Sequence, residues 1–115
     1  MNPIPTKTLS DGLVLPAIGF GTYKLKGEAG AKSIQSAIEL GYRLIDSAFN
    51  YENEGTVGEA VRRAGVPRSE LILTSKLPGR HHDYEKALQT VEESLFRTGV
   101  SYYDLYLIHW PNPLE

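Results

Sequence analysis

The sequence contains no cysteine, no long apolar run and little net charge. Without cysteine the chain can form neither a disulfide scaffold nor a thiolate metal site, which agrees with a reducing cytoplasm. No window approaches the roughly 18 apolar residues of a membrane span. The start, MNPIPTKTLS, lacks the apolar segment of a secretory signal. We therefore expect a soluble, cytoplasmic protein without a membrane partner.

The net charge of −2 also bears on the choice of partner. Nucleic-acid binding requires a concentrated positive face, and the lysines and arginines here are scattered between acids. The 115 residues, 41% hydrophobic and 23% charged, have the length and composition of an ordinary globular domain. These features argue against nucleic acid as a partner and indicate a single domain over residues 1–115.

Strand and helix signals alternate along most of the chain. Before they begin, Asp11-Gly12 lies between two β-prone runs. This pair supplies the positive φ angles of a two-residue turn and predicts a β-hairpin over residues 6–15. From residue 16 onward, short strands are predicted at 16–21, 42–46, 71–77 and 104–109. We expect the first to be buried and the third, LILTSKL, to be covered on both faces.

Amphipathic helices are predicted between these strands, each ending at a glycine suited to a helix C-cap: Gly41, Gly65 and Gly99. The third helix has Asp83 as its expected N-cap. Its expected apolar face consists of Tyr84, Ala87, Leu88, Val91, Leu95 and Phe96. Repeated strand-then-helix order requires parallel pairing through right-handed crossovers. This α/β pattern leaves two architectures open, a doubly wound open sheet and part of a parallel (β/α)8 barrel.

Polar residues suited to catalysis gather where the predicted strands end. Asp46, Lys76 and His109 lie at the ends of the second, third and fourth strands. The segment 21–23 follows the first strand, and Tyr51 lies five residues beyond Asp46. In parallel α/β folds the carboxyl ends of the strands collect ligands and catalytic groups, because the loops there are free of the packed helices. All four strands therefore carry candidate groups at one end of the sheet.

Each of these residues also has a structural reading: a loop cap for Asp46, a solvated ammonium for Lys76, and packed rings for Tyr51 and His109. Together, however, they form a proton-donor site. An adjacent ammonium stabilises a tyrosine phenolate and lowers the pKa of the phenol, which is about 10 in isolation. Asp46 would keep Lys76 protonated and in place, and a neutral imidazole at His109 would orient a substrate oxygen. The set suits protonation of a carbonyl that receives hydride from a cofactor.

Other functional motifs are weak or missing. GFGTYK places Lys24 where a dinucleotide-binding fingerprint has its third glycine, so a Rossmann phosphate loop is not supported. His81 and His82 are adjacent and have no third ligand nearby, so we interpret them as solvated loop and expect no metal. Neither a G-x-S-x-G elbow nor a Walker motif occurs.

Several stretches resemble the aldo-keto reductase family. GYRLIDSAFNYENEGTVG (residues 41–58) is similar to the family's N-terminal signature. ILTSKL resembles the strand that carries the family's lysine, DLYLIHWP the strand that carries its histidine, and LPAIGFGTYK its first barrel strand. The likeness covers nearly the whole chain, and the loops look closest to bacterial diketogluconate-reductase and glyoxal-reductase members.

The resemblance implies a (β/α)8 barrel that reduces small-molecule aldehydes and ketones with NADPH. The implied catalytic tetrad is Asp46, Tyr51, Lys76 and His109, with Tyr51 as the general acid. Carried over residue by residue, the cofactor-binding positions are Gly21, Thr22, Tyr23 and Asp46. The implied substrate-binding positions are Tyr23, Phe49, His109 and Trp110.

The length departs from the family's pattern. A complete barrel takes about 250 residues, whereas about four of the eight βα units are recognised here, over residues 16–115. We therefore expect a truncated N-terminal half that lacks most of the cofactor-binding half and is inactive by itself. Two alternatives stay open. One is a non-enzymatic half-barrel that assembles with itself or with a complementing half, since its sheet edges would be unpaired; the other is a flavodoxin-like binding domain.

Overall fold

The computed structural model describes residues 4–111 and contains a four-stranded parallel sheet with three helices packed on it. The strands, in their order across the sheet, are β3 (Phe20–Gly21), β4 (Leu44–Asp46), β5 (Ile72–Leu77) and β6 (Leu105–Ile108). The helices are α1 (Gly27–Glu39), α2 (Glu54–Arg63) and α3 (Tyr84–Thr98). One helix lies between each pair of successive strands, so strands that follow one another in sequence are neighbours in the sheet.

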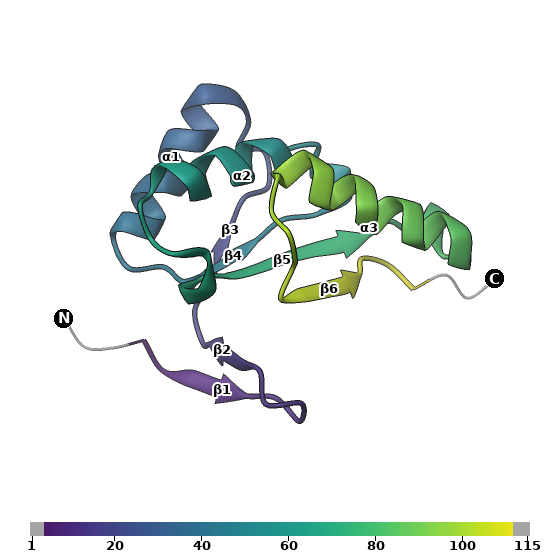
Figure 1. Cartoon of the computed structure of the whole chain (residues 1–115), viewed down its shortest axis with the longest axis horizontal. Coiled ribbons are helices and arrows are strands. Elements are labelled where there is room, and N and C mark those ends of the chain that lie inside the picture. Colours follow the sequence, from purple (N-terminus) through teal and green to yellow (C-terminus); the bar gives the residue numbers. More distant parts are fainter. Residues whose placement is uncertain (1–3, 112–115) are drawn as a thin grey trace.

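This topology decides between the two predicted architectures. A doubly wound sheet reverses its strand order and carries helices on both faces. Here the order is sequential, and all three helices lie on one face of the sheet (Figure 1). Such regular crossovers curl a parallel sheet into a barrel with its helices outside. The fold is therefore of the (β/α)8 barrel type, with four of its strands among the described residues.

The helix ends follow the predicted signals. Gly41, Gly65 and Gly99 have φ angles of 118°, 73° and 74°, a left-handed conformation that glycine adopts without steric cost. Asp83 caps α3, because its Oδ2 accepts a hydrogen bond from the backbone N–H of Lys86 at 3.3 Å. The three predicted helix ends at glycine and the predicted N-cap of α3 are confirmed.

The hydrophobic core lies between the helices and the sheet. Its buried members are Ile34, Ile38, Ile45, Val57, Ala60, Val61, Leu71 and Leu73. Ile45 of β4 and Leu73 of β5 both point toward the helices. Because side chains alternate between the two faces of a strand, Asp46 and Lys76 point to the opposite face, which is the inside of the barrel.

The N-terminal hairpin consists of β1 (Thr6–Thr8) and β2 (Val14–Pro16) and lies on the side of the sheet away from the helices (Figure 1). The hairpin is confirmed, but the predicted two-residue turn is wrong. Leu9 N–H donates to the carbonyl of Leu13 at 2.8 Å, so the loop has three residues, and Gly12 alone among them has a positive φ, of 91°. Asp11 instead accepts the N–H of Leu13 with its side chain at 2.9 Å.

The first predicted sheet strand is wrong in length and in burial. Only Phe20 and Gly21 form β3, and Ile18 is 51% exposed. The reason is that Pro16 pairs with Thr6 in the hairpin, so the chain must leave the hairpin before it joins the sheet. Among the described strands, β3 has β4 as its single neighbour and lies at an edge.

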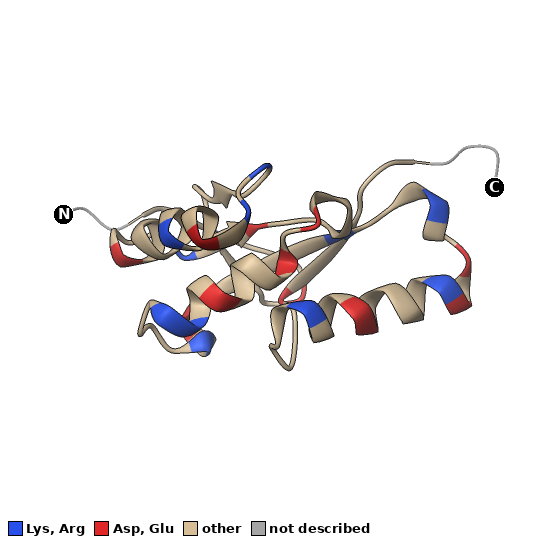
Figure 2. Cartoon of the chain, turned by 90° about the horizontal axis from the view of Figure 1, so that it is seen from above, with Lys and Arg blue, Asp and Glu red and all other residues tan. Residues whose placement is uncertain are grey.

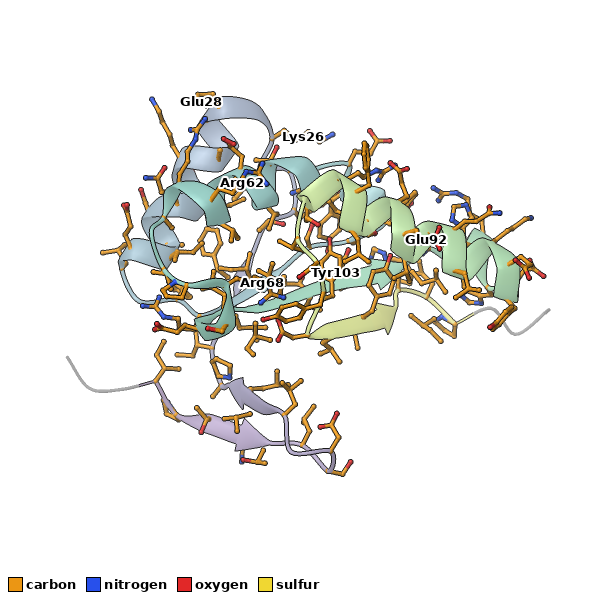
Figure 3. The ribbon with its side chains drawn as sticks, viewed as in Figure 1. Lys26, Glu28, Arg62, Arg68, Glu92 and Tyr103 are labelled. Atoms are coloured by element: carbon orange, nitrogen blue, oxygen red, sulfur yellow. The ribbon has the colours of Figure 1, made fainter. Side chains whose placement is uncertain are left out.

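The apolar face predicted for α3 is also wrong in part. Tyr84, Leu88 and Phe96 are 73%, 45% and 83% exposed. The buried positions of this helix are Thr90, Ser94 and Thr98. Their short side chains allow close approach to the sheet, where Tyr103 lies beneath the helix (Figure 3) and donates a hydrogen bond to the backbone of Ser94 at 3.3 Å. The interface between α3 and the sheet is therefore formed by closely packed small polar side chains.

Charged residues of both signs are interspersed along the helices, as Figure 2 shows. Glu28 and Arg63 join α1 to α2 by two hydrogen bonds of 2.9 Å. Arg68 and Asp104 form a less exposed pair at 2.8 Å beside the start of β5. Within residues 4–111, no helix is long and apolar enough to cross a membrane.

Candidate active site

Three of the four predicted catalytic residues lie at the carboxyl ends of neighbouring strands. Asp46 is the last residue of β4, Lys76 is the last but one of β5, and His109 directly follows β6. The backbone N–H of His109 donates to the carbonyl of Leu77 at 2.9 Å and continues the parallel ladder. The sheet therefore brings an acid, a lysine and a histidine to one end of the barrel.

The ammonium of Lys76 is the centre of the site. Its Nζ lies 2.7 Å from both carboxylate oxygens of Asp46 and 2.9 Å from the carbonyl of Ser47. The side chain of Lys76 is only 15% exposed. A largely buried ammonium requires compensation of this kind, since burial without a partner opposes the charge. Asp46 therefore fixes both the charge and the position of Lys76.

Tyr51 reaches the same ammonium from a short 3-10 turn, η1 (Phe49–Tyr51). Its hydroxyl oxygen lies 3.4 Å from Nζ of Lys76. Its ring centroid lies 5.8 Å from that of His109 and 5.1 Å from that of Tyr23. The structure therefore brings together all four residues of the predicted tetrad.

A buried asparagine that the sequence analysis did not identify supports the floor of the site. Asn53 is 1% exposed, and its Nδ2 donates to the carbonyls of Thr22 and Leu25 at 2.6 and 3.1 Å. Its Oδ1 accepts the hydroxyl of Ser47 at 2.8 Å. Asn53 is the N-cap residue of α2, yet its side chain makes no cap hydrogen bond. It instead ties the loop after β3 to the loop after β4.

A buried carboxylate supports η1 from the helix side. Glu54 is fully buried; it accepts hydrogen bonds from the Ser75 hydroxyl at 2.5 Å and from Arg97 Nη1 at 3.4 Å. Arg97 also donates to the carbonyl of Phe49 at 3.3 Å, and its guanidinium lies 4.0 Å from the Phe49 ring. Ser75 belongs to β5 and Phe49 opens η1. This group therefore connects the strand and the turn that carry two tetrad residues.

His109 has a shifted pKa and a stacked neighbour. Burial, and then the ammonium of Lys76, lower the pKa of His109, while Asp46 acts in the opposite direction. Its Nδ1 is buried and has no hydrogen-bond partner among residues 4–111. The ring stacks on that of Trp110 with centroids 5.2 Å apart and planes 9° apart. At neutral pH the uncharged imidazole is therefore favoured.

A cavity of about 400 Å³ opens at the tetrad. It is lined by Tyr23, Asn50, Tyr51, His109 and Trp110. Of the predicted substrate-binding residues, Tyr23, His109 and Trp110 lie in this lining, whereas Phe49 lines a neighbouring groove. Asn50 was not identified from sequence, because only the 3-10 turn determines which of two adjacent side chains faces the cavity.

The predicted cofactor-binding segment, residues 21–23, has mixed exposure. At Gly21 no atom lies within 4 Å of the place a Cβ would occupy, and Tyr23 is 65% exposed. Thr22 is buried, with its hydroxyl donating to the carbonyl of Asp46 at 2.8 Å. The open backbone at Gly21 and the exposed ring of Tyr23 beside Tyr51 leave this segment accessible to a ligand. The side chain of Thr22 has a structural role.

The sequence is similar to that of one enzyme family over most of its length. Residues 17–115 match the sequence profile of the Aldo/keto reductase family. The 2,5-diketo-D-gluconic acid reductase B of Corynebacterium sp. (strain SHS752001) is 50% identical over 113 residues, which cover 98% of this chain and 41% of that protein. Methylglyoxal reductase DkgB of Salmonella typhi is 43% identical over 101 residues, covering 88% of this chain and 38% of that protein.

A solved structure gives the same result for the fold. The crystal structure of the Bombyx mori aldo-keto reductase in complex with NADP matches with a TM-score of 0.88 and 36% identity, covering 96% of this chain and 39% of that one. The chain thus spans about two fifths of the length of these relatives. The bacterial reductase type and the barrel fold predicted from the motifs are both confirmed.

Proposed function

This chain belongs to the aldo/keto reductase family, and we propose that it carries the proton-delivery site of an enzyme that reduces aldehydes and ketones to alcohols. The observation that supports this most directly is the position of Lys76. Its Nζ lies 2.7 Å from both oxygens of Asp46 and 3.4 Å from the hydroxyl of Tyr51. An ammonium so placed stabilises the phenolate that forms when the hydroxyl of Tyr51 gives its proton to a substrate.

Tyr51 is the proposed general acid. As a carbonyl oxygen gains negative charge in the cavity, the phenolic hydroxyl donates its proton to that oxygen. The phenolate that remains is stabilised by the ammonium of Lys76, which Asp46 holds in place. The uncharged imidazole of His109 donates an N–H to the same oxygen and orients the carbonyl. The substrate is a small carbonyl compound, consistent with a cavity of about 400 Å³.

NADPH is the proposed cofactor. When bound, it supplies the hydride that the carbonyl carbon receives. Gly21 and Tyr23 would contact its nicotinamide end, because the backbone at Gly21 is open and the ring of Tyr23 lies 5.1 Å from that of Tyr51. The Bombyx mori protein of similar fold was solved in complex with NADP.

Replacement of Tyr51 by phenylalanine tests this function. The protein to assay is this chain joined to the part of the Corynebacterium reductase that it does not cover. We expect Tyr51→Phe to lower kcat by about 10²- to 10⁴-fold, the usual contribution of a general acid, because the proton donor is lost. The dissociation constant for NADPH should stay close to the unmodified value. Stopped-flow absorbance measures kcat, and fluorescence titration measures the dissociation constant for NADPH.

Tyr84→Phe is the matched control. Tyr84 is 73% exposed on α3 and does not line the cavity, so loss of its hydroxyl should leave kcat unchanged. Turnover by Tyr51→Phe within a few-fold of the unmodified protein would disprove the assignment of Tyr51 as the acid.

A further inference from the structure

A second hollow, larger than the catalytic cavity, lies between η1, the 3-10 turn η3 (Gly79–His81) and α3. Its volume is about 590 Å³. The side chains around it are Phe49, Arg80, His81, Lys86, Gln89, Thr90 and Glu93. We call it the Arg80 groove. The proposed proton transfer makes no use of it.

The charge of the Arg80 groove is predominantly positive. Arg80 and Lys86 form no salt bridge with any residue in the described range 4–111. The one acid in the lining, Glu93, lies 3.2 Å from Nε of Arg97, outside the reach of a salt bridge with Arg80 or Lys86 among the described residues. Two cations without a carboxylate partner therefore face one hollow.

A hydrogen bond links the lining of the Arg80 groove to the lining of the catalytic cavity. Nη1 of Arg80 donates to Oδ1 of Asn50 at 2.7 Å, and Asn50 lines the cavity that contains Tyr51. This bond orients the guanidinium while leaving its other N–H groups for a ligand. An acidic group on Arg80 would therefore lie next to the cavity in which a carbonyl is reduced.

His81 adds a proton-linked group to the Arg80 groove. Its Nδ1 lies 2.8 Å from the hydroxyl oxygen of Thr90, and that hydroxyl donates its own proton to the carbonyl of Lys86 at 2.6 Å. Nδ1 is therefore the donor, which leaves Nε2 as the nitrogen that takes up a further proton. Burial, and then the charges of Arg80 and Lys86, lower the pKa of His81. An anion that neutralises these cations would reverse part of that shift.

We propose that the Arg80 groove is a binding site for an organic carboxylate, held by Arg80 and Lys86. Guanidinium and ammonium donors form short, charge-assisted hydrogen bonds with carboxylate oxygens, and a planar guanidinium matches a carboxylate in two-pronged geometry. The carboxylate comes either from the acidic end of a carbonyl substrate or from a separate small anion. The site itself is independent of the reduction chemistry, so it can be tested without turnover.

The test is an NMR titration of the 115-residue chain, which contains three histidines. Succinate is the charged probe and succinamide its uncharged counterpart. We expect succinate, and not succinamide, to move the His81 signals and to raise the pH midpoint of His81. Arg80→Gln and Lys86→Gln should each weaken succinate binding roughly tenfold, as loss of a charged hydrogen bond does. Lys32→Gln, an exposed change on α1, is the control and should leave binding unchanged.

A second probe identifies the source of the carboxylate. The probe 4-oxopentanoate carries both a carbonyl and a carboxylate. If it alters both the His81 signals and the fluorescence of Trp110 in the catalytic cavity, the Arg80 groove holds the acidic end of a substrate. If it moves only the His81 signals, the groove binds a separate anion. Equal responses to succinate and succinamide, or unchanged succinate affinity in both Arg80→Gln and Lys86→Gln, would overturn the proposal.

Discussion

At the scale of single residues, the stacked pair of His109 and Trp110 provides a direct optical reading of the site. Trp110 is the one tryptophan of the sequence, and its ring lies 5.2 Å from that of His109 at 9°. A protonated imidazole quenches indole fluorescence more strongly than a neutral one. The emission of this protein therefore reports the charge of His109.

We expect Trp110 emission to fall on acidification with a midpoint below about 6.5, the ordinary value for histidine. Burial and the Lys76 ammonium both lower the pKa of His109. In Lys76→Met the midpoint should move upward, and in His109→Gln the transition should vanish. The unfolded chain binds this proton at higher pH than the folded one, so the free energy of unfolding should also fall as pH drops below about 6.5. A wild-type midpoint at or above 6.5 would contradict the described environment.

The positions of the residues around the candidate active site were predictable from sequence to differing degrees. Asp46, Lys76 and His109 end apolar strands, and the parallel order brings strand ends together, so strand periodicity alone predicts their proximity. Asn50 and Asn53 could not be predicted in the same way. Their roles depend on the turn η1 and on which backbone carbonyls face the side chains, and no periodic pattern encodes either property.

At the scale of elements, the contact between α2 and α3 depends on the absence of a side chain. A Cβ added to Gly58 of α2 would lie 1.9 Å from the carbonyl oxygen of Thr98, the last residue of α3. The sequence predicted a packed apolar face on α3, because the amphipathic pattern is the usual signal for burial. In the structure Gly58 lies against the backbone of Thr98 instead, a contact that hydrophobic periodicity does not detect.

Gly58→Ala should therefore destabilise the protein. Alanine favours a helix interior by up to about 1 kcal/mol over glycine, but the clash with backbone atoms of α3 costs more. We expect a net loss of about 1–3 kcal/mol in the free energy of unfolding, measured by urea denaturation. Gly55→Ala is the control in the same helix, since its Cβ would come no closer than 3.3 Å to the carbonyl of Arg97. Equal stability of the two variants would show that α2 and α3 can separate freely.

At the scale of the whole molecule, β6 is an edge strand of the sheet formed by residues 4–111, and it carries apolar side chains in solvent. Leu107 and Ile108 of β6 are 40% and 65% exposed, and Phe96 on α3 is 83% exposed. Monomeric proteins seldom expose large apolar side chains together with an unpaired strand edge. This surface fits a further part of a barrel, which agrees with the span of about two fifths of the relatives' length.

A complementation experiment tests whether this surface pairs with the rest of a barrel. The partner is the part of a relative that the chain does not cover. We expect the 115-residue chain by itself to show no NADPH-dependent reduction of a simple aldehyde. Mixed with the separately expressed part of the Corynebacterium reductase that the chain does not cover, it should form a discrete one-to-one complex and turn over substrate. NADPH absorbance and light scattering measure these results. The same mixture with Tyr51→Phe controls for contaminating activity, because its assembly should be normal and its turnover lost. Steady turnover by the unmixed chain would contradict the expected inactivity. A defined dimer that resists complementation would show that β6 is covered by a second copy of this chain.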